Sequence, residues 1–146
     1  MASPLVKEGF LPDAISTDLH IGSMNAGMKD QLNVMSKFLA LGLSLEDVIA
    51  KSTLGPARMV KREDLGHLSV GAPADVAVLS LQTGRFGFTD SFGGRLRADK
   101  KLVCEMTLRD GRIVYDLNGL ARPDWETLPK GYRGTGDARW DAYSRR

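Results

Sequence analysis

The sequence predicts an α/β chain in which helices come first and a small antiparallel sheet follows. In the first part, apolar residues such as Leu32, Met35 and Phe38 recur at three- and four-residue spacing, which is the period of an amphipathic helix. Beyond Lys61 the period becomes that of short strands, and Asp110-Gly111 is a two-residue hairpin signal. These two periods, one after the other, predict the fold class.

An apolar run near the N-terminus, Gly9 to Ile15, predicts a short buried strand. Polar residues follow it at once, namely Ser16, Thr17, Asp18 and His20, before Gly22. In barrels of alternating strands and helices, catalytic side chains lie where a strand ends. The same residue types also bond nearby backbone amides in ordinary turns. Residue types alone favour that structural reading over a catalytic one.

Residues 22–30 are predicted to be a loop, because two glycines stand among small and polar residues. A helix is expected at roughly 30–41, with Gly42 as its end. Met35 and Phe38 of this helix are interpreted as core packing rather than as a cofactor site.

Two further helices are expected next. Ser44 and Asp47 make a weak capping box for a helix at roughly 45–51. Pro56 then stands in the first turn of a short helix that runs through Val60.

The second half is predicted to form strands separated by glycine and proline. The expected strands are residues 68–70, 75–81, 102–108 and 113–115. Residues 84–90 are expected to be extended, and residues 91–101 to form a glycine-rich, charged loop. From residue 117 onward no period persists, so an irregular tail along the surface is expected.

Charge and cysteine content narrow the class of protein. The net charge of +2 is too small to argue for nucleic acid, and acidic residues are interleaved with basic ones in the tail. Cys104 is the only cysteine, which excludes an internal disulfide and fits a buried small hydrophobe. The N-terminal residues lack the features of a signal peptide, and no run of 18 apolar residues predicts a membrane span. A cytoplasmic protein with no membrane partner is expected.

A resemblance to a known protein family makes these expectations of fold and function more specific. The segment Ile-Ser-Thr-Asp-Leu-His, residues 15–20, resembles the stretch after the eighth barrel strand in the amidohydrolase superfamily, the metal-dependent hydrolases that include dihydroorotase and D-aminoacylase. Residues 35–39, 52–58 and 66–76 follow the C-terminal order and spacing of that family, so the similarity covers roughly residues 9–116. The order of these pieces together is fairly specific to the family.

The resemblance implies a particular architecture. The chain would be the C-terminal piece of a (β/α)8 amidohydrolase barrel, with the last strand and the following helices in residues 1–61. Residues 62–116 would form half of a small β-sandwich, and 117–146 the irregular tail. A complete barrel of this type needs about 250 residues, more than the 146 present.

The resemblance also implies a site. Asp18 matches a residue that binds a metal and carries a proton between the attacking water and the leaving group. His20, Ser23 and Asn25 would lie on the substrate side. The deacetylase-like members of the family act on small acylated acids, and the complete enzyme would use a divalent metal, zinc above all. This sequence contains only His20 and His67, and His67 is interpreted as a turn residue. The isolated chain is therefore expected to be inactive and to bind no metal tightly.

The competing interpretation is a non-catalytic association module. A last barrel strand without neighbours would expose two edges and an apolar face. Such a chain would pair with another copy of itself or with a polypeptide that supplies the rest of the barrel.

Overall fold

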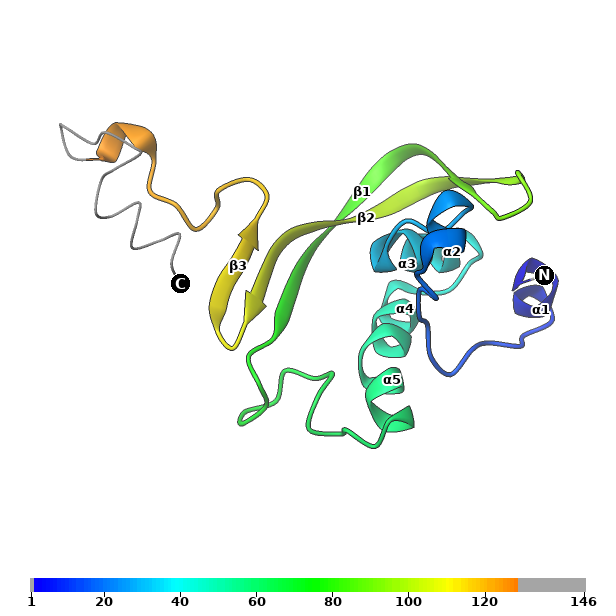
Figure 1. The fold of residues 1–146 in the computed structure, drawn as a ribbon, viewed down its shortest axis with the longest axis horizontal. Helices are drawn as coiled ribbons and strands as arrows, with labels where there is room; N and C mark the ends of the chain where they lie inside the picture. Colours follow the sequence, from blue (N-terminus) through cyan, green and yellow to red (C-terminus); the bar gives the residue numbers. More distant parts are fainter. Residues whose placement is uncertain (1, 129–146) are drawn as a thin grey trace.

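The computed structural model describes residues 2–128, and Figure 1 shows their arrangement. The helices are α1 (Ala2–Lys7), α2 (Ile21–Asn25), α3 (Gln31–Ala40), α4 (Leu45–Ser52) and α5 (Leu54–Met59), and a short 3-10 helix covers Trp125–Thr127. The strands are β1 (Val76–Thr89), β2 (Arg95–Arg109) and β3 (Arg112–Asp116). Helices α2 and α3 lie beside the half of the long β1–β2 hairpin that carries its turn, and β3 lies at the other end (Figure 1).

The three strands form one antiparallel sheet in the order β1-β2-β3. Leu81 pairs with Leu102 across β1 and β2, and Phe88 pairs with Leu96 nearer the turn. The second turn is the predicted hairpin: Asp110 and Gly111 both have positive φ, 50° and 72°, as a tight two-residue turn between strands requires. The small antiparallel sheet expected from the sequence is confirmed.

An apolar core joins the helices to the sheet. Its buried members are Ile15, Val34, Met35, Leu43, Val48 and Leu102. The buried Ser36 reinforces the contact between α3 and β2, because its Oγ accepts a hydrogen bond from the Leu102 amide at 3.0 Å. The same hydroxyl donates to the Leu32 carbonyl at 2.6 Å, so this buried polar group is fully partnered.

The helices α3 and α4 begin where the sequence predicts them. The Asp30 carboxylate accepts the Asn33 amide at 2.6 Å at the start of α3. Ser44 caps α4 by accepting the Asp47 amide at 3.0 Å and donating to the Asp47 carboxylate at 2.7 Å. Pro56 lies in the first turn of α5, which begins two residues earlier than that proline. Side-chain caps therefore mark the starts of α3 and α4, whereas α5 has no side-chain cap.

The predicted strand at Gly9 to Ile15 is absent, and this prediction was wrong. A strand needs backbone partners on a neighbouring strand, and no strand of the described residues pairs with this segment. The Phe10 side chain is 71% exposed, whereas Ile15 is only 3% exposed. Helix α1, which precedes this segment, was not expected at all.

Three other sequence-based expectations also need correction. Residues 22–30 are not simply a loop, because α2 occupies Ile21–Asn25. Residues 68–70 form no strand, and Leu68 and Val70 are exposed. The expected loop at 91–101 is mostly strand, since β2 begins at Arg95 and its charged residues pair with β1 across a ribbon that leaves one face to solvent.

The expected tail at 117–146 is only partly described. Up to residue 128 it contains the 3-10 helix at Trp125–Thr127, and the remaining residues lie outside the described part of the chain. The division at residues 61 and 116 stays a prediction. No helix among residues 2–128 combines the length and apolar character needed to cross a bilayer.

Candidate functional site

The chain that leads to Asp18 is fixed against the helices rather than within a sheet. The Ile15 amide donates to the Lys51 carbonyl at the end of α4, at 2.7 Å. The Ile15 carbonyl accepts from the Gln31 side chain at the start of α3, at 3.2 Å. A Cβ built at Gly55 would lie 2.6 Å from the Asp13 carbonyl oxygen, so α5 meets this segment backbone to backbone. Buried Ile15 thus anchors a segment whose polar end projects outward.

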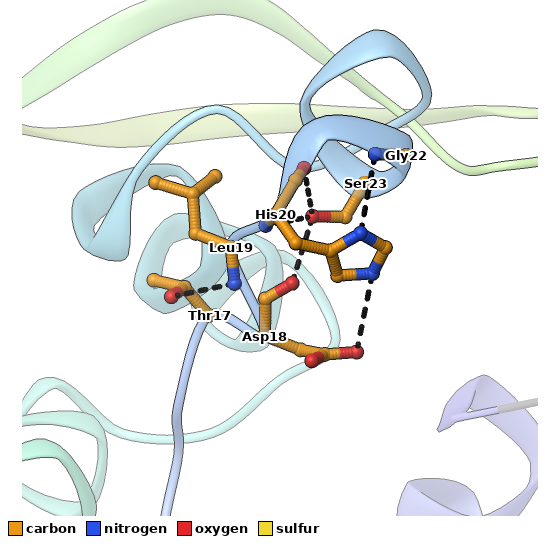
Figure 2. A network of polar contacts seen from close by, with 6 residues as sticks. All are labelled: Thr17, Asp18, Leu19, His20, Gly22 and Ser23. Carbon is orange, nitrogen blue, oxygen red and sulfur yellow. Dashed lines mark hydrogen bonds and ion pairs between the residues drawn. The ribbon is translucent and has the colours of Figure 1, made fainter.

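A sharp turn follows at Thr17 and Asp18. Asp18 has φ of +46°, in the left-handed region that disfavours most side chains and that aspartate tolerates better than most. The Thr17 hydroxyl accepts the Leu19 amide at 3.2 Å, which stabilises the turn (Figure 2). Residues held in this backbone region cost of order 1–3 kcal/mol and cluster at functional sites.

Helix α2 begins immediately after this turn and is capped from both directions (Figure 2). The His20 ring accepts the Gly22 amide at its Nδ1, at 3.1 Å. The Ser23 hydroxyl accepts the His20 amide at 2.9 Å, which completes a reciprocal cap. The same hydroxyl donates to the Asp18 carbonyl at 2.7 Å. Ser23 therefore ties the backbone of Asp18 to the first turn of α2.

The side chains of Asp18 and His20 face each other at the surface. The His20 Nε2 lies 4.0 Å from the Asp18 Oδ2, and the two side chains are 63% and 86% exposed. Because Nδ1 accepts a hydrogen bond, a neutral His20 ring carries its proton on Nε2, the atom that faces the carboxylate. Thr17, not Asp18, makes the local turn bond, so the Asp18 carboxylate stays available to solvent.

The structure brings three of the four sequence-predicted site residues together. Asp18, His20 and Ser23 form one network, whereas Asn25 lies at the last turn of α2, exposed and outside that network. His67 is far along the chain, and both of its ring nitrogens are engaged locally: Nε2 with the Glu63 carbonyl at 3.0 Å, and Nδ1 with the Ser69 amide at 3.3 Å.

Two features of this site were not predicted from the sequence. The histidine cap of α2 lacks the usual Ser, Thr, Asp or Asn signal, and α2 is only five residues long, so no periodic pattern reveals it. The bond from Gln31 to Ile15 joins residues 16 positions apart and depends on the tertiary fold.

The residues present do not make a metal centre by themselves. Within residues 2–128, no three His, Cys, Asp or Glu side chains are grouped so that they could hold one ion. Zinc sites in proteins take three or four protein ligands. Asp18 fits the role of one carboxylate ligand, but a complete set is not found in this part of the chain.

Comparison with known proteins identifies the class. The amidohydrolase family matches residues 10–115, which include the Asp18 turn, helices α2 to α5 and nearly the whole sheet. The chain belongs to the amidohydrolase family. The resemblance noted in the sequence is thereby confirmed.

Among curated relatives, two bacterial deacetylases are similar to this chain. A deacetylase of Brucella anthropi is 37% identical over 100 residues, which are 68% of this chain and 25% of the relative. A deacetylase of Agrobacterium fabrum is 37% identical over 93 residues, 64% of this chain and 23% of the relative. The chain thus spans about a quarter of the length of these curated relatives.

Two solved structures support the same fold. A crystal structure of an adenine deaminase superposes with a TM-score of 0.74 at 29% identity, covering 79% of this chain and 31% of the deaminase. A crystal structure of a dihydroorotase gives a TM-score of 0.71 at 30% identity, covering 79% of this chain and 32% of the dihydroorotase. The helices and the antiparallel sheet are therefore arranged as in amidohydrolases.

Proposed function

We propose that these residues belong to a hydrolase that cleaves an amide or ester bond of a small acylated substrate. They form the C-terminal piece of a (β/α)8 barrel together with half of a small β-sandwich. One observation carries the proposal: the Asp18 carboxylate projects to solvent from a left-handed turn, inside the stretch matched by the amidohydrolase family. Thr17 makes the local turn bond, so the Asp18 carboxylate is not engaged by its own backbone.

In this proposal Asp18 is the general acid and base. Its carboxylate accepts a proton from the attacking water and then donates that proton to the departing nitrogen or oxygen. The His20 Nε2 lies 4.0 Å from the carboxylate, near enough to stabilise its charge electrostatically during this exchange. Ser23 keeps the Asp18 backbone in the conformation that directs the carboxylate outward.

The substrate is proposed to contact the first turns after Asp18. His20, Ser23 and Asn25 stand on or next to α2, where their polar groups can meet the acyl or acid part of a small molecule. The two deacetylase relatives support an acylated substrate. The specificity of such a barrel depends on loops after its earlier strands, which are not among these residues.

A divalent metal, above all zinc, is proposed for the complete enzyme. Bound metal of this kind lowers the pKa of its water so that hydroxide forms near neutral pH. Asp18 would supply one ligand, and the other ligands would come from sequence beyond these 146 residues. The 146-residue chain by itself is therefore proposed to be inactive and to hold no stoichiometric metal.

The second candidate function is association, favoured by exposed apolar side chains on several segments. Phe10, Val70 and Phe92 are largely exposed, and they lie before α2, before β1 and in the β1–β2 turn respectively. Their burial would favour pairing with a second copy or with a chain that supplies the rest of the barrel. Light scattering of the purified chain tests this: a concentration-independent monomer would contradict it.

The catalytic proposal is tested with Asp18→Asn in the naturally encoded protein that contains these residues. Loss of the proton-accepting carboxylate should lower turnover of N-acetylated acids by at least about 100-fold while the fold is kept. Asp13→Asn, at an exposed aspartate of the same segment, is the matched control and should retain activity. Near-normal turnover by Asp18→Asn would refute the assignment.

Sequencing the DNA upstream of Met1 provides an independent test of the proposed parent enzyme. A reading frame that carries His-x-His and two later histidines would supply the missing metal ligands. An unrelated upstream sequence would contradict the proposal for the native protein.

A further inference from the structure

The turn between β1 and β2 touches the chain just after α2. Gly27 is buried at this contact, and a Cβ placed there would lie 2.6 Å from the Thr89 carbonyl oxygen and 2.8 Å from the Asp90 Cα. Both neighbours are backbone atoms, which cannot rotate aside as a side chain can. Residue 27 must therefore be glycine for the two segments to meet as they do.

Lys37 of α3 also contacts Gly27. Its Nζ donates a hydrogen bond to the Gly27 carbonyl, ten residues earlier in the chain. Burial lowers the pKa of the Lys37 ammonium below its usual range, and the nearby Asp90 carboxylate partly opposes that shift. The Lys37 ammonium thus interacts both with the Gly27 carbonyl after α2 and with the Asp90 carboxylate of the hairpin turn.

Asp90 shapes the turn itself. Its carboxylate accepts the amides of Phe92 at 2.8 Å and Gly94 at 2.7 Å. These two bonds hold the pKa of the Asp90 carboxyl below its usual range. The Asp90 amide also donates to the Gly94 carbonyl at 3.0 Å, so the turn is closed by its own groups before it meets Gly27.

Hydrogen bonds continue from Gly27 back to the candidate site. The amides of Ala26 and Met28 donate to the Ser23 carbonyl, at 3.2 and 3.1 Å. Lys29 donates to the Met24 carbonyl at 3.1 Å. Ser23 in turn bonds the Asp18 carbonyl through its hydroxyl. The hairpin turn and Asp18 are therefore connected by a continuous series of short contacts.

We propose that Gly27, Lys37 and the Asp90 turn form a positioning junction. The junction fixes the chain after α2 and, through Ser23, the backbone of Asp18. This inference rests on the proposed function, in which Asp18 is the reacting group. Lys37 is a positioning residue in this scheme, because its ammonium bonds the Gly27 carbonyl rather than a group of the candidate site. The sheet would thereby help to set the geometry of a site that lies on the helical segment.

The test uses NMR relaxation of backbone amides in the 146-residue chain. Lys37→Met removes the donor to Gly27 and keeps most of the apolar side chain. The order parameters of residues 22–28 should fall from about 0.85 to below about 0.6, values that separate rigid from flexible backbone. The Leu102 amide, bonded to Ser36, should stay rigid. Lys37→Arg, which keeps a charged donor, should restore order at residues 22–28.

Lys51→Met is the matched control, since Lys51 is also a half-buried lysine in the last turn of a helix. It should leave both regions rigid. Unchanged order at residues 22–28 in Lys37→Met would overturn the proposal. A loss of order that includes Leu102 would overturn it too, because it would mean general loosening. The measurement requires no turnover, so its outcome is independent of whether Asp18→Asn confirms the catalytic role.

Turnover supplies the functional readout. In the naturally encoded protein, Lys37→Met should reduce kcat by about tenfold or more through misplacement of Asp18, while Lys37→Arg recovers most of it. Full activity of Lys37→Met would contradict a positioning role.

Discussion

The α3–β2 contact and the Asp18 turn are held together in opposite ways. At the first, side chains such as Val34 and Leu102 are buried, and Ser36 bonds the Leu102 amide in the interior. At the second, the network of Asp18, His20 and Ser23 lies at the surface, and the Asp18 backbone is left-handed. The first arrangement stabilises the fold. The second keeps the Asp18 carboxylate exposed at a cost in backbone energy.

The largest expected effect lies in the core. Leu102→Ala removes a side chain that is 3% exposed between β2 and the helices, and it should lower the free energy of unfolding by about 2–5 kcal/mol. Leu81→Ala is the matched control, because Leu81 pairs with Leu102 across the sheet yet is 39% exposed. Denaturant unfolding should show a much smaller loss for the control. Equal losses would contradict the placement of the core.

The hydrogen bond between α3 and β2 should have the next largest effect. Ser36→Ala leaves the Leu102 amide without its partner in a buried position, which should cost about 1–3 kcal/mol. Ser80→Ala, at a half-buried serine of β1, serves as the comparison. Chemical denaturation of the two variants distinguishes a specific buried bond from a general effect of removing a hydroxyl. A cost no larger than that of Ser80→Ala would show that this bond does not stabilise the contact.

Gly27→Ala tests the contact between the chain after α2 and the β1–β2 turn. The added methyl group would clash with the Thr89–Asp90 backbone, so a cost of about 1–3 kcal/mol is expected from overpacking. Gly42→Ala is the comparison variant. A Cβ at Gly42 would meet open space, but its φ is +104°. Any loss of stability in Gly42→Ala therefore comes from backbone conformation alone. Thermal unfolding of both variants would separate the two causes. Unchanged stability of Gly27→Ala would mean that the hairpin turn does not pack closely against residue 27.

The sequence predicted the elements whose signals are local. Asp30 and Ser44 cap α3 and α4 through bonds to residues three positions away, and Asp110-Gly111 turns the chain between adjacent strands. A reader of the sequence can find such signals because both partners lie within a few residues.

The errors fall where pairing with another segment decides the backbone structure. Gly9 to Ile15 has the composition of a strand, but no strand within residues 2–128 pairs with it, and its backbone bonds helical residues instead. Arg95 to Lys101 has the composition of a loop, but β1 lies alongside and pairs with it. In both cases the presence or absence of a pairing strand decided the outcome, and residue types alone did not report it.

The candidate site was found through family resemblance rather than composition. Asp18 stood out among several polar residues only because its neighbours match the amidohydrolase pattern. The left-handed backbone at Asp18 and the capping role of His20 became visible only in three dimensions. Asn25 was predicted beside them and lies on α2 outside the network.

The central claim, that the Asp18 turn serves chemistry rather than stability, is tested most directly by comparing Asp18→Gly with Asp110→Gly. Both aspartates have left-handed backbones, with φ of +46° and +50°. At each, relief of backbone strain offsets the larger entropy of glycine in the unfolded chain, so stability should change by less than about 1 kcal/mol. Hydrolysis of an N-acetylated acid by the naturally encoded protein should fall by at least about 100-fold for Asp18→Gly and stay unchanged for Asp110→Gly. Equal activity of the two variants would contradict the claim.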